Sequence, residues 1–135
     1  MKEYPHASYE EMCELAGQGM TLSGYASHTP GRMAVTSSHG NRTFSALNAR
    51  ANQLVRSWRQ AGIKAGDSVA LLMGNRPAFV EVYKAALRSG VRLTPINWHL
   101  SGEEVFYVVD NCEARAFITE DRYLTTANFV IEHAD

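Results

Sequence analysis

Apolar side chains recur at helical spacing between residues 44 and 58. Most lie three or four residues apart, which places them on one face of a single helix: Phe44, Leu47, Ala51, Leu54, Val55 and Trp58. Thr43 or Ser45 can cap the start of this helix, and Gly62 stands where helices commonly end. Turn-forming residues at 38–41 separate two short segments of strand character, so a β-hairpin is expected just before the helix.

Three short apolar runs, residues 69–73, 91–96 and 114–119, predict β-strands. The first is continuously apolar, as expected of a strand that is covered on both faces. Helical patterns separate the runs. Pro77 suits the first turn of one helix, and Ser101 with Glu104 three positions later forms a capping-box pattern at the start of the other. This order of elements predicts parallel strands joined by right-handed crossovers.

The expected fold class is therefore α/β. It has an N-terminal β-hairpin and long helix, followed by a three-stranded parallel βαβαβ unit that is part of a larger doubly wound sheet. Four segments follow from the patterns: a leader at 1–30, hairpin plus helix at 31–62, the βαβαβ unit at 63–120, and the start of the next helix at 121–135. Within the leader, a short helix begins at Ser8 and is ended by Gly17 and Gly19.

Composition and charge narrow the class of protein. Apolar residues make up 45% and charged residues 20%, which is ordinary for a soluble folded chain. A formal net charge of −1 gives no overall attraction to nucleic acid, and we interpret Arg50, Arg56 and Arg59 as a solvated helix face. No secretory segment opens the chain, and its longest apolar run is too short to cross a bilayer. We expect a cytoplasmic protein with no nucleic-acid partner and no transmembrane segment.

The two cysteines show neither a CxxC pair nor metal-ligand spacing. Cys13 and Cys112 both have apolar neighbours in the sequence, where cysteine usually behaves as a small buried hydrophobic residue. A reducing compartment is the simplest interpretation, and a long-range disulfide is the alternative.

Sequence patterns of catalytic sites are weak throughout. The turn Gly74-Asn75-Arg76-Pro77 lacks the further glycines of a dinucleotide fingerprint, although phosphate could still bind at the following helix N-terminus. The five histidines have neither metal spacing nor a nucleophile motif. Glu103 and Glu104 are adjacent on a helix and so point apart, which makes them a poor acid/base pair. We therefore predict no catalytic, cofactor-binding or metal-binding residue in this chain.

Asn97 and His99 are the candidates for a substrate-side role. They follow the second predicted strand, and ligands of open α/β sheets bind outside the carboxyl ends of the strands. The alternative is structural: Trp98 and His99 pack the loop, while Asn97 makes turn hydrogen bonds.

Four stretches between residues 43 and 121 resemble the acyl-CoA synthetases of the adenylate-forming, AMP-binding superfamily. Residues 43–48 read TFSALN, similar to the family's TY-x-E-L-N, with Ala46 in place of the usual Glu or Gln. Residues 62–71 read GIKAGDSVAL, similar to the family's G-(V/I)-x-x-G-D-x-V-A-(L/I). Residues 75–81 read NRPAFVE, similar to its N-x-x-(E/A)-F-V-E. Residues 93–104, LTPINWHLSGEE, resemble a stretch whose Trp-His variant is typical of bacterial fatty-acyl-CoA synthetases. Each stretch is weak alone, and their order and spacing make the resemblance specific.

This resemblance implies a two-step, AMP-forming acid–thiol ligase. A fatty or related carboxylate attacks the α-phosphate of ATP, and the thiol of coenzyme A then displaces AMP. ATP, Mg²⁺ and coenzyme A are thus implied for a longer parent protein, and no cofactor is implied for this chain alone. The family's Ser/Thr/Gly-rich phosphate loop and its later catalytic motifs have no counterpart here. The chain is expected to be a non-catalytic N-terminal subdomain, residues 1–135, whose partner is the remainder of the ligase.

Two other functions stay open. One is a stand-alone binding or interaction module derived from the ligase fold, and the other is a small nucleotide-binding protein that uses the turn at Gly74. Exposed strand edges favour self-association, so a homodimer or oligomer through a sheet edge is also expected.

Overall fold

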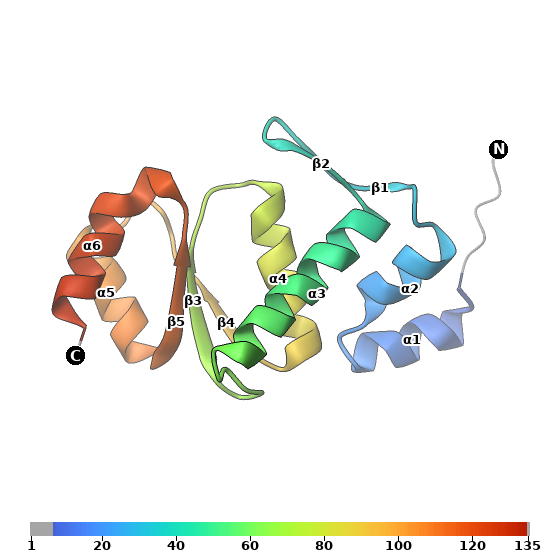
Figure 1. Ribbon diagram of the computed structural model, residues 1–135, viewed down its shortest axis with the longest axis horizontal. Helices are drawn as coiled ribbons and strands as arrows, with labels where there is room; N and C mark the ends of the chain where they lie inside the picture. The colour runs from blue at the N-terminus through green and yellow to red at the C-terminus, as the bar shows by residue number, and fades with distance from the viewer. Residues whose placement is uncertain (1–6, 135) are drawn as a thin grey trace. The chain divides into compact units, whose positions relative to one another are not determined.

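The computed structural model describes residues 7–134, which divide into two compact units. The first unit contains the described residues up to Lys64 together with Arg76–Gly90, and the second contains Ala65–Asn75 and the chain from Val91 onward. Figure 1 shows the order of helices and strands along the chain. The mixed α/β class agrees with the expectation from the sequence, including a two-stranded antiparallel sheet and a three-stranded parallel sheet.

The leader contains two helices where one was predicted. Helix α1 (Tyr9–Gly17) begins after Ser8, whose Oγ accepts the N–H of Glu11 at 3.1 Å. Helix α2 (Thr21–His28) was missed, because its short polar sequence, interrupted by Gly24, has little helical periodicity. Gly24 is buried, and a Cβ at this position would lie 2.6 Å from Cδ1 of Leu15 in α1. Packing between the two helices thus supports a segment of weak intrinsic propensity.

The hairpin and long helix lie where the sequence placed them. Strands β1 (Met33–Ser37) and β2 (Gly40–Thr43) pair antiparallel, and α3 (Phe44–Gln60) follows without a break. Thr43 is the N-cap, since its Oγ1 accepts the N–H of Ala46 at 3.2 Å. The buried side of α3 consists of Leu47, Ala51, Val55 and Trp58, while Arg50, Arg56 and Arg59 are exposed, as expected.

Polar contacts join helix α4 (Pro77–Ser89) to the hairpin and to α3 in the first unit. Nε of Arg42 in β2 donates to Oε1 of the buried Glu81 at 2.8 Å. The Arg88 guanidinium donates to the side-chain oxygens of Asn48, at 2.8 Å, and Asn52. Burial lowers the pKa of Arg88, and no carboxylate among the described residues forms an ion pair with it.

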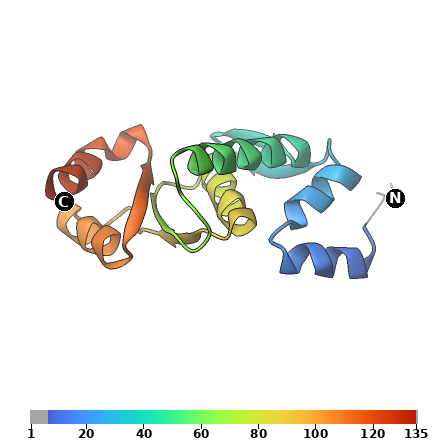
Figure 2. The ribbon, with the colours of Figure 1, turned by 60° about the horizontal axis from the view of Figure 1, so that its bottom comes forward.

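The second unit is a parallel sheet with helices on one face. Strand β3 (Ser68–Leu72) lies between β4 (Arg92–Pro95) and β5 (Ala114–Thr119). Helices α5 (Gly102–Asn111) and α6 (Leu124–His133) pack side by side against the same side of this sheet (Figures 1 and 2). A short 3₁₀ turn, Asp121–Tyr123, links β5 to α6. The core between sheet and helices contains Ala70, Leu72, Ile96, Val105, Val109, Tyr123 and Val130.

The predicted capping box at the start of α5 is confirmed. Oγ of Ser101 accepts the N–H of Glu104 at 3.3 Å, and the N–H of Ser101 donates to Oε2 of Glu104 at 2.8 Å. Hydrogen bonds that Ser101 donates to the Glu104 carboxylate, from its backbone N–H first and from its side chain second, lower the pKa of the Glu104 carboxyl. Because the folded-state pKa is the lower one, this cap stabilises the fold above the ordinary pKa of glutamate and weakens as the pH falls.

The structure tests two expectations from the sequence, one about the cysteines and one about membrane-spanning helices. Both cysteines are free, and Cys13 is exposed on α1, so the expectation that it is buried was wrong. Helix α1 buries none of its residues, which explains why apolar neighbours in the sequence do not cover this thiol. In the part of the chain that the structure describes, no helix has the length and apolarity needed to span a bilayer.

Substitution of Ala46 by glutamate is expected to raise the free energy of unfolding by about 0.3–1 kcal/mol. Helix α3 has no acidic residue in its first turn, whereas α5 has Glu103 and Glu104. Ala46 is exposed in that turn, so a carboxylate there meets the positive end of the helix dipole. Urea unfolding of the 135-residue chain measures the gain, and Ala46→Gln is the uncharged control. A gain that is equal for both substitutions, or that persists unchanged in 1 M salt, would contradict this explanation.

Candidate functional site

The carboxyl ends of β3, β4 and β5 lie at one edge of the second unit, because the three strands are parallel. The chain leaves this edge at three places: Gly74 after β3, residues 96–100 after β4, and residues 120–123 after β5. This is the edge where ligands of open α/β sheets bind, and it carries both candidates chosen from the sequence.

Asn97 and His99 are brought together, but their side chains differ in availability. Oδ1 of Asn97 accepts the backbone N–H of His99 at 3.1 Å, which is the turn hydrogen bond of the structural alternative. The His99 ring is exposed and lies against Trp98, with 3.5 Å between the ring centroids. Trp98 itself is 42% exposed. The loop after β4 therefore presents an indole and an imidazole to its surroundings, while the Asn97 amide oxygen is used to shape the turn.

Glu120 joins the ends of β3 and β5. Its side chain is buried, and Oε1 accepts the backbone N–H of Gly74 at 2.9 Å. The same carboxylate oxygen lies 3.2 Å from where a Cβ at position 74 would be. A side chain at position 74 would therefore press on the carboxylate, so glycine allows the two chain segments to approach closely.

The sequence patterns did not single out Arg122, whose guanidinium lies beside two aromatic rings at this edge. Its guanidinium carbon lies 5.3 Å from the centroid of the Trp98 ring and 4.8 Å from that of Tyr123. Both distances are within the range of cation–π contacts. Arg122 follows a predicted strand as closely as His99 does, so the rule that selected His99 could also have selected Arg122.

Two buried hydroxyl groups at this edge have no hydrogen-bond partner within residues 7–134: Oγ1 of Thr119 and the phenol oxygen of Tyr123. Tyr123 is only 9% exposed, so the bulk of its ring lies in the core and its hydroxyl points toward the position of Gly74, 3.8 Å from where a Cβ would be. Buried hydroxyls of proteins are normally hydrogen-bonded, so this edge has capacity for a further polar group.

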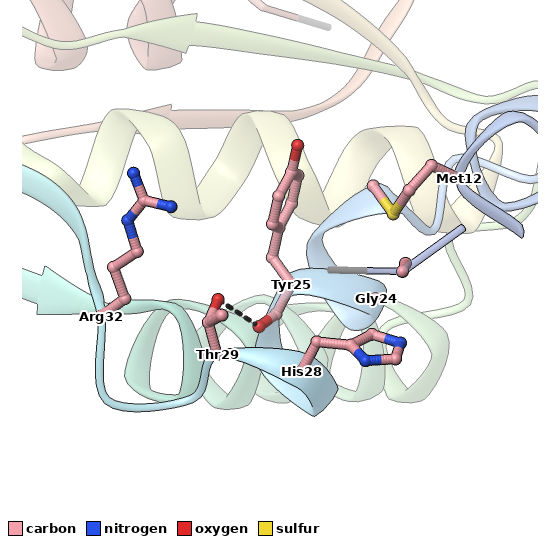
Figure 3. A pocket seen from close by; sticks show the side chains of 7 residues that line it. Met12, Gly24, Tyr25, His28, Thr29 and Arg32 are labelled. Carbon is pink, nitrogen blue, oxygen red and sulfur yellow. Dashed lines mark hydrogen bonds between the residues drawn. The ribbon is translucent and has the colours of Figure 1, made fainter. Parts of the chain in front are cut away.

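The first unit has a cavity of its own between α1 and α2, shown in Figure 3. Its free volume is about 70 Å³, and its lining includes Met12, Gly24, Tyr25, His28 and Arg32. Nε2 of His28 lies 3.0 Å from Oε1 of Glu11, and the hydroxyl of Thr29 donates to the carbonyl of Tyr25 at 3.1 Å. Ligand pockets usually enclose about 300–1,000 Å³, so this cavity is too small for an organic substrate.

Comparison with known proteins gives a consistent result. Residues 22–135 match the protein family described as AMP-binding enzyme. A 2-succinylbenzoate–CoA ligase of Geobacillus kaustophilus is 37% identical over 69% of this chain and 19% of its own length. A fatty acid–[acyl-carrier-protein] ligase, ScoC, of Streptomyces coeruleorubidus is 29% identical over 76% of this chain and 20% of its own length.

Solved structures show the same similarity. The N-terminal domain of FACL13 from Mycobacterium tuberculosis superposes with a TM-score of 0.80 and 28% identity, over 87% of this chain and 30% of that one. The chain spans about a fifth of the length of the two curated relatives named above.

Proposed function

This chain belongs to the AMP-binding enzyme family, and we propose that it is the N-terminal segment of an ATP-dependent acid–thiol ligase. The observation that carries the proposal is the family match over residues 22–135, together with relatives that are named as ligases of carboxylic acids. In the proposed reaction a fatty or related carboxylate attacks the α-phosphate of ATP, forming an acyl-adenylate and releasing pyrophosphate. A thiol then attacks the acyl carbon, forms a thioester and releases AMP.

The part played by this chain is proposed to be structural and substrate-facing. Its parallel sheet forms one flank of the parent's larger sheet, and its carboxyl edge borders the substrate cleft. Asn97 fixes the turn through its bond to the His99 N–H, and His99 and Trp98 face the ligand side. ATP, Mg²⁺ and coenzyme A would serve the parent, and we assign no residue of this chain to Mg²⁺. Catalytic groups are proposed to lie in the remainder of the ligase.

The remainder of the ligase is the proposed partner of the open sheet edges. Within the described residues, β4 and β5 each pair with β3 alone, so each has an outer edge that another strand can extend. Strands of the parent would occupy such an edge in the complete protein. Self-association of the isolated chain through the same edge stays a prediction.

Coenzyme A is the proposed acceptor, and an acyl carrier protein is the second candidate. The Geobacillus kaustophilus relative is named for coenzyme A, whereas ScoC is named for the acyl carrier protein. Both acceptors present a thiol to the acyl-adenylate, so the adenylating half of the proposed reaction is common to the two.

Product analysis of the full-length protein tests the proposal. With ATP, Mg²⁺ and a panel of fatty and aromatic acids, we expect AMP and one acyl-CoA thioester to accumulate in equal amounts. Thioester on carrier protein instead of on coenzyme A would select the second candidate. Conversion of ATP to ADP, or no acid-dependent product from any acid, would contradict the proposed ligase.

A further inference from the structure

Arg122 is exposed, and its guanidinium lies beside two aromatic rings at the carboxyl edge of the parallel sheet. The guanidinium lies 4.8 Å from the Tyr123 ring, which is mostly buried, and 5.3 Å from the half-exposed Trp98 ring. Aromatic faces attract a guanidinium without using its N–H donors, because the contact is with the π-face of each ring. The rings thus favour this position of the guanidinium and leave its N–H donors available.

The carboxylates next to Arg122 in the sequence make other contacts. Oδ1 of Asp121 accepts the backbone N–H of Arg122 at 3.0 Å, and Oε1 of Glu120 accepts the N–H of Gly74. No acidic side chain among residues 7–134 forms an ion pair with the Arg122 guanidinium. By contrast, Arg42 has Glu81 at 2.8 Å and Arg115 has Asp67 at 3.9 Å.

Gly74 keeps room beside this cation. A Cβ at position 74 would lie 3.5 Å from Nη1 of Arg122 and 3.8 Å from the hydroxyl of Tyr123. The hydroxyl is buried and has no partner within the described residues. The same Cβ position lies 3.2 Å from Oε1 of Glu120, the carboxylate oxygen that accepts the N–H of Gly74. The guanidinium of Arg122, the buried hydroxyl of Tyr123 and the carboxylate of Glu120 therefore surround the Gly74 backbone at this sheet edge.

We propose that Arg122, supported by Trp98 and Tyr123, binds an oxyanion of one substrate of the ligase, either a phosphate or a carboxylate group. This rests on the proposed function, because all three substrates of such a ligase carry one of these groups. A planar guanidinium donates two parallel hydrogen bonds to a phosphate or a carboxylate, which a lysine ammonium cannot reproduce. Arg122 is thus a substrate-binding residue and takes no part in bond making or breaking.

The test compares Arg122→Gln, Arg122→Lys and Trp98→Leu in the full-length protein, with KM and kcat measured for the acid, ATP and the thiol acceptor in turn. Arg122→Gln is expected to raise KM for one substrate about 10- to 100-fold, the usual worth of charge-assisted hydrogen bonds. Arg122→Lys should keep part of the effect of the charge, and Trp98→Leu should raise KM for the same substrate. The KM that rises identifies the source: the acid for a carboxylate, ATP or coenzyme A for a phosphate.

Arg115→Gln is the matched control. Arg115 is an exposed residue of β5 in the same unit, so this variant removes the same charge elsewhere. It should leave all three KM values within twofold of the parent. If Arg122→Gln also leaves all three KM values within twofold, the proposal is wrong.

Binding measurements separate this inference from the proposed function. Calorimetric titration of the full-length protein uses inorganic pyrophosphate as the phosphate probe and hexanoate as the carboxylate probe. We expect Arg122→Gln to weaken binding of one probe at least tenfold, and Arg115→Gln to leave both affinities unchanged. Dependence on Arg122 in a protein without ligase activity would overturn the proposed function and keep the anion site. Equal affinities in all variants would overturn the anion site.

Discussion

Replacing Gly19 by alanine is expected to lower the free energy of unfolding by about 2–4 kcal/mol. Gly19 follows the C-cap of α1 with a φ of 70°, a left-handed conformation that costs a residue with a Cβ about 1–2 kcal/mol. Its N–H and that of Met20 bond the carbonyls of Ala16 and Leu15, which is the Schellman arrangement. A Cβ here would also lie 2.4 Å from the backbone oxygen of Leu87 at the end of α4. Because backbone atoms cannot rotate away, α1 would have to move.

Gly17→Ala provides the matched control for this prediction. Gly17 lies two residues earlier, within α1, and no heavy atom outside its own helix lies within 4 Å of the position of its Cβ. Alanine is the better helix former, so this variant should be more stable than the parent by about 0.5–1 kcal/mol. Urea unfolding of both variants measures the two free energies. Equal transition midpoints for them would show that Gly19 is not constrained in this way.

Removal of the Arg42 side chain is expected to have the second large effect on the free energy of unfolding. Arg42→Met should lower the free energy of unfolding by about 2–3 kcal/mol, because Glu81 would keep a buried charge without its cation. The estimate stays below the range for fully buried pairs, since the Arg42 side chain is 28% exposed and partly screened by solvent.

The double variant Arg42→Met/Glu81→Gln separates the lost contact from the unpaired charge. It should be more stable than Arg42→Met alone, because glutamine places no charge in the buried site. Chemical unfolding of the parent, Arg42→Met, Glu81→Gln and the double variant completes a double-mutant cycle. Additive losses would mean that the two side chains do not interact.

The elements predicted from the sequence are those whose signals are local. The face of α3, the capping box of Ser101 and Glu104, and the strand at residues 114–119 each rest on spacing within one segment, and each is confirmed. Helix α2 was missed because its stability comes from packing on α1 and not from its own periodicity. The contacts of Arg88 with Asn48 and Asn52 join positions 40 and 36 residues apart, which spacing within one segment does not relate.

The candidate site was predicted only in part, and for the same reason. The rule about carboxyl ends of strands led to Asn97 and His99, which the structure places next to each other. It does not by itself bring residues 120–123 beside Trp98, because this requires the order of the strands as well as their positions in the chain. The contacts of Arg122 with the rings of Trp98 and Tyr123 became visible only in three dimensions.

Acid-dependent exchange of pyrophosphate into ATP tests the central claim most directly. The measurement uses the product of the complete reading frame and the 135-residue chain side by side, with Mg²⁺ and a panel of carboxylic acids. We predict that the complete protein exchanges pyrophosphate only when a suitable acid is present, and that the 135-residue chain does not exchange it. A reading frame that stops after Asp135, or a complete protein that shows no exchange with any acid, would contradict the assignment to a ligase and favour a binding module.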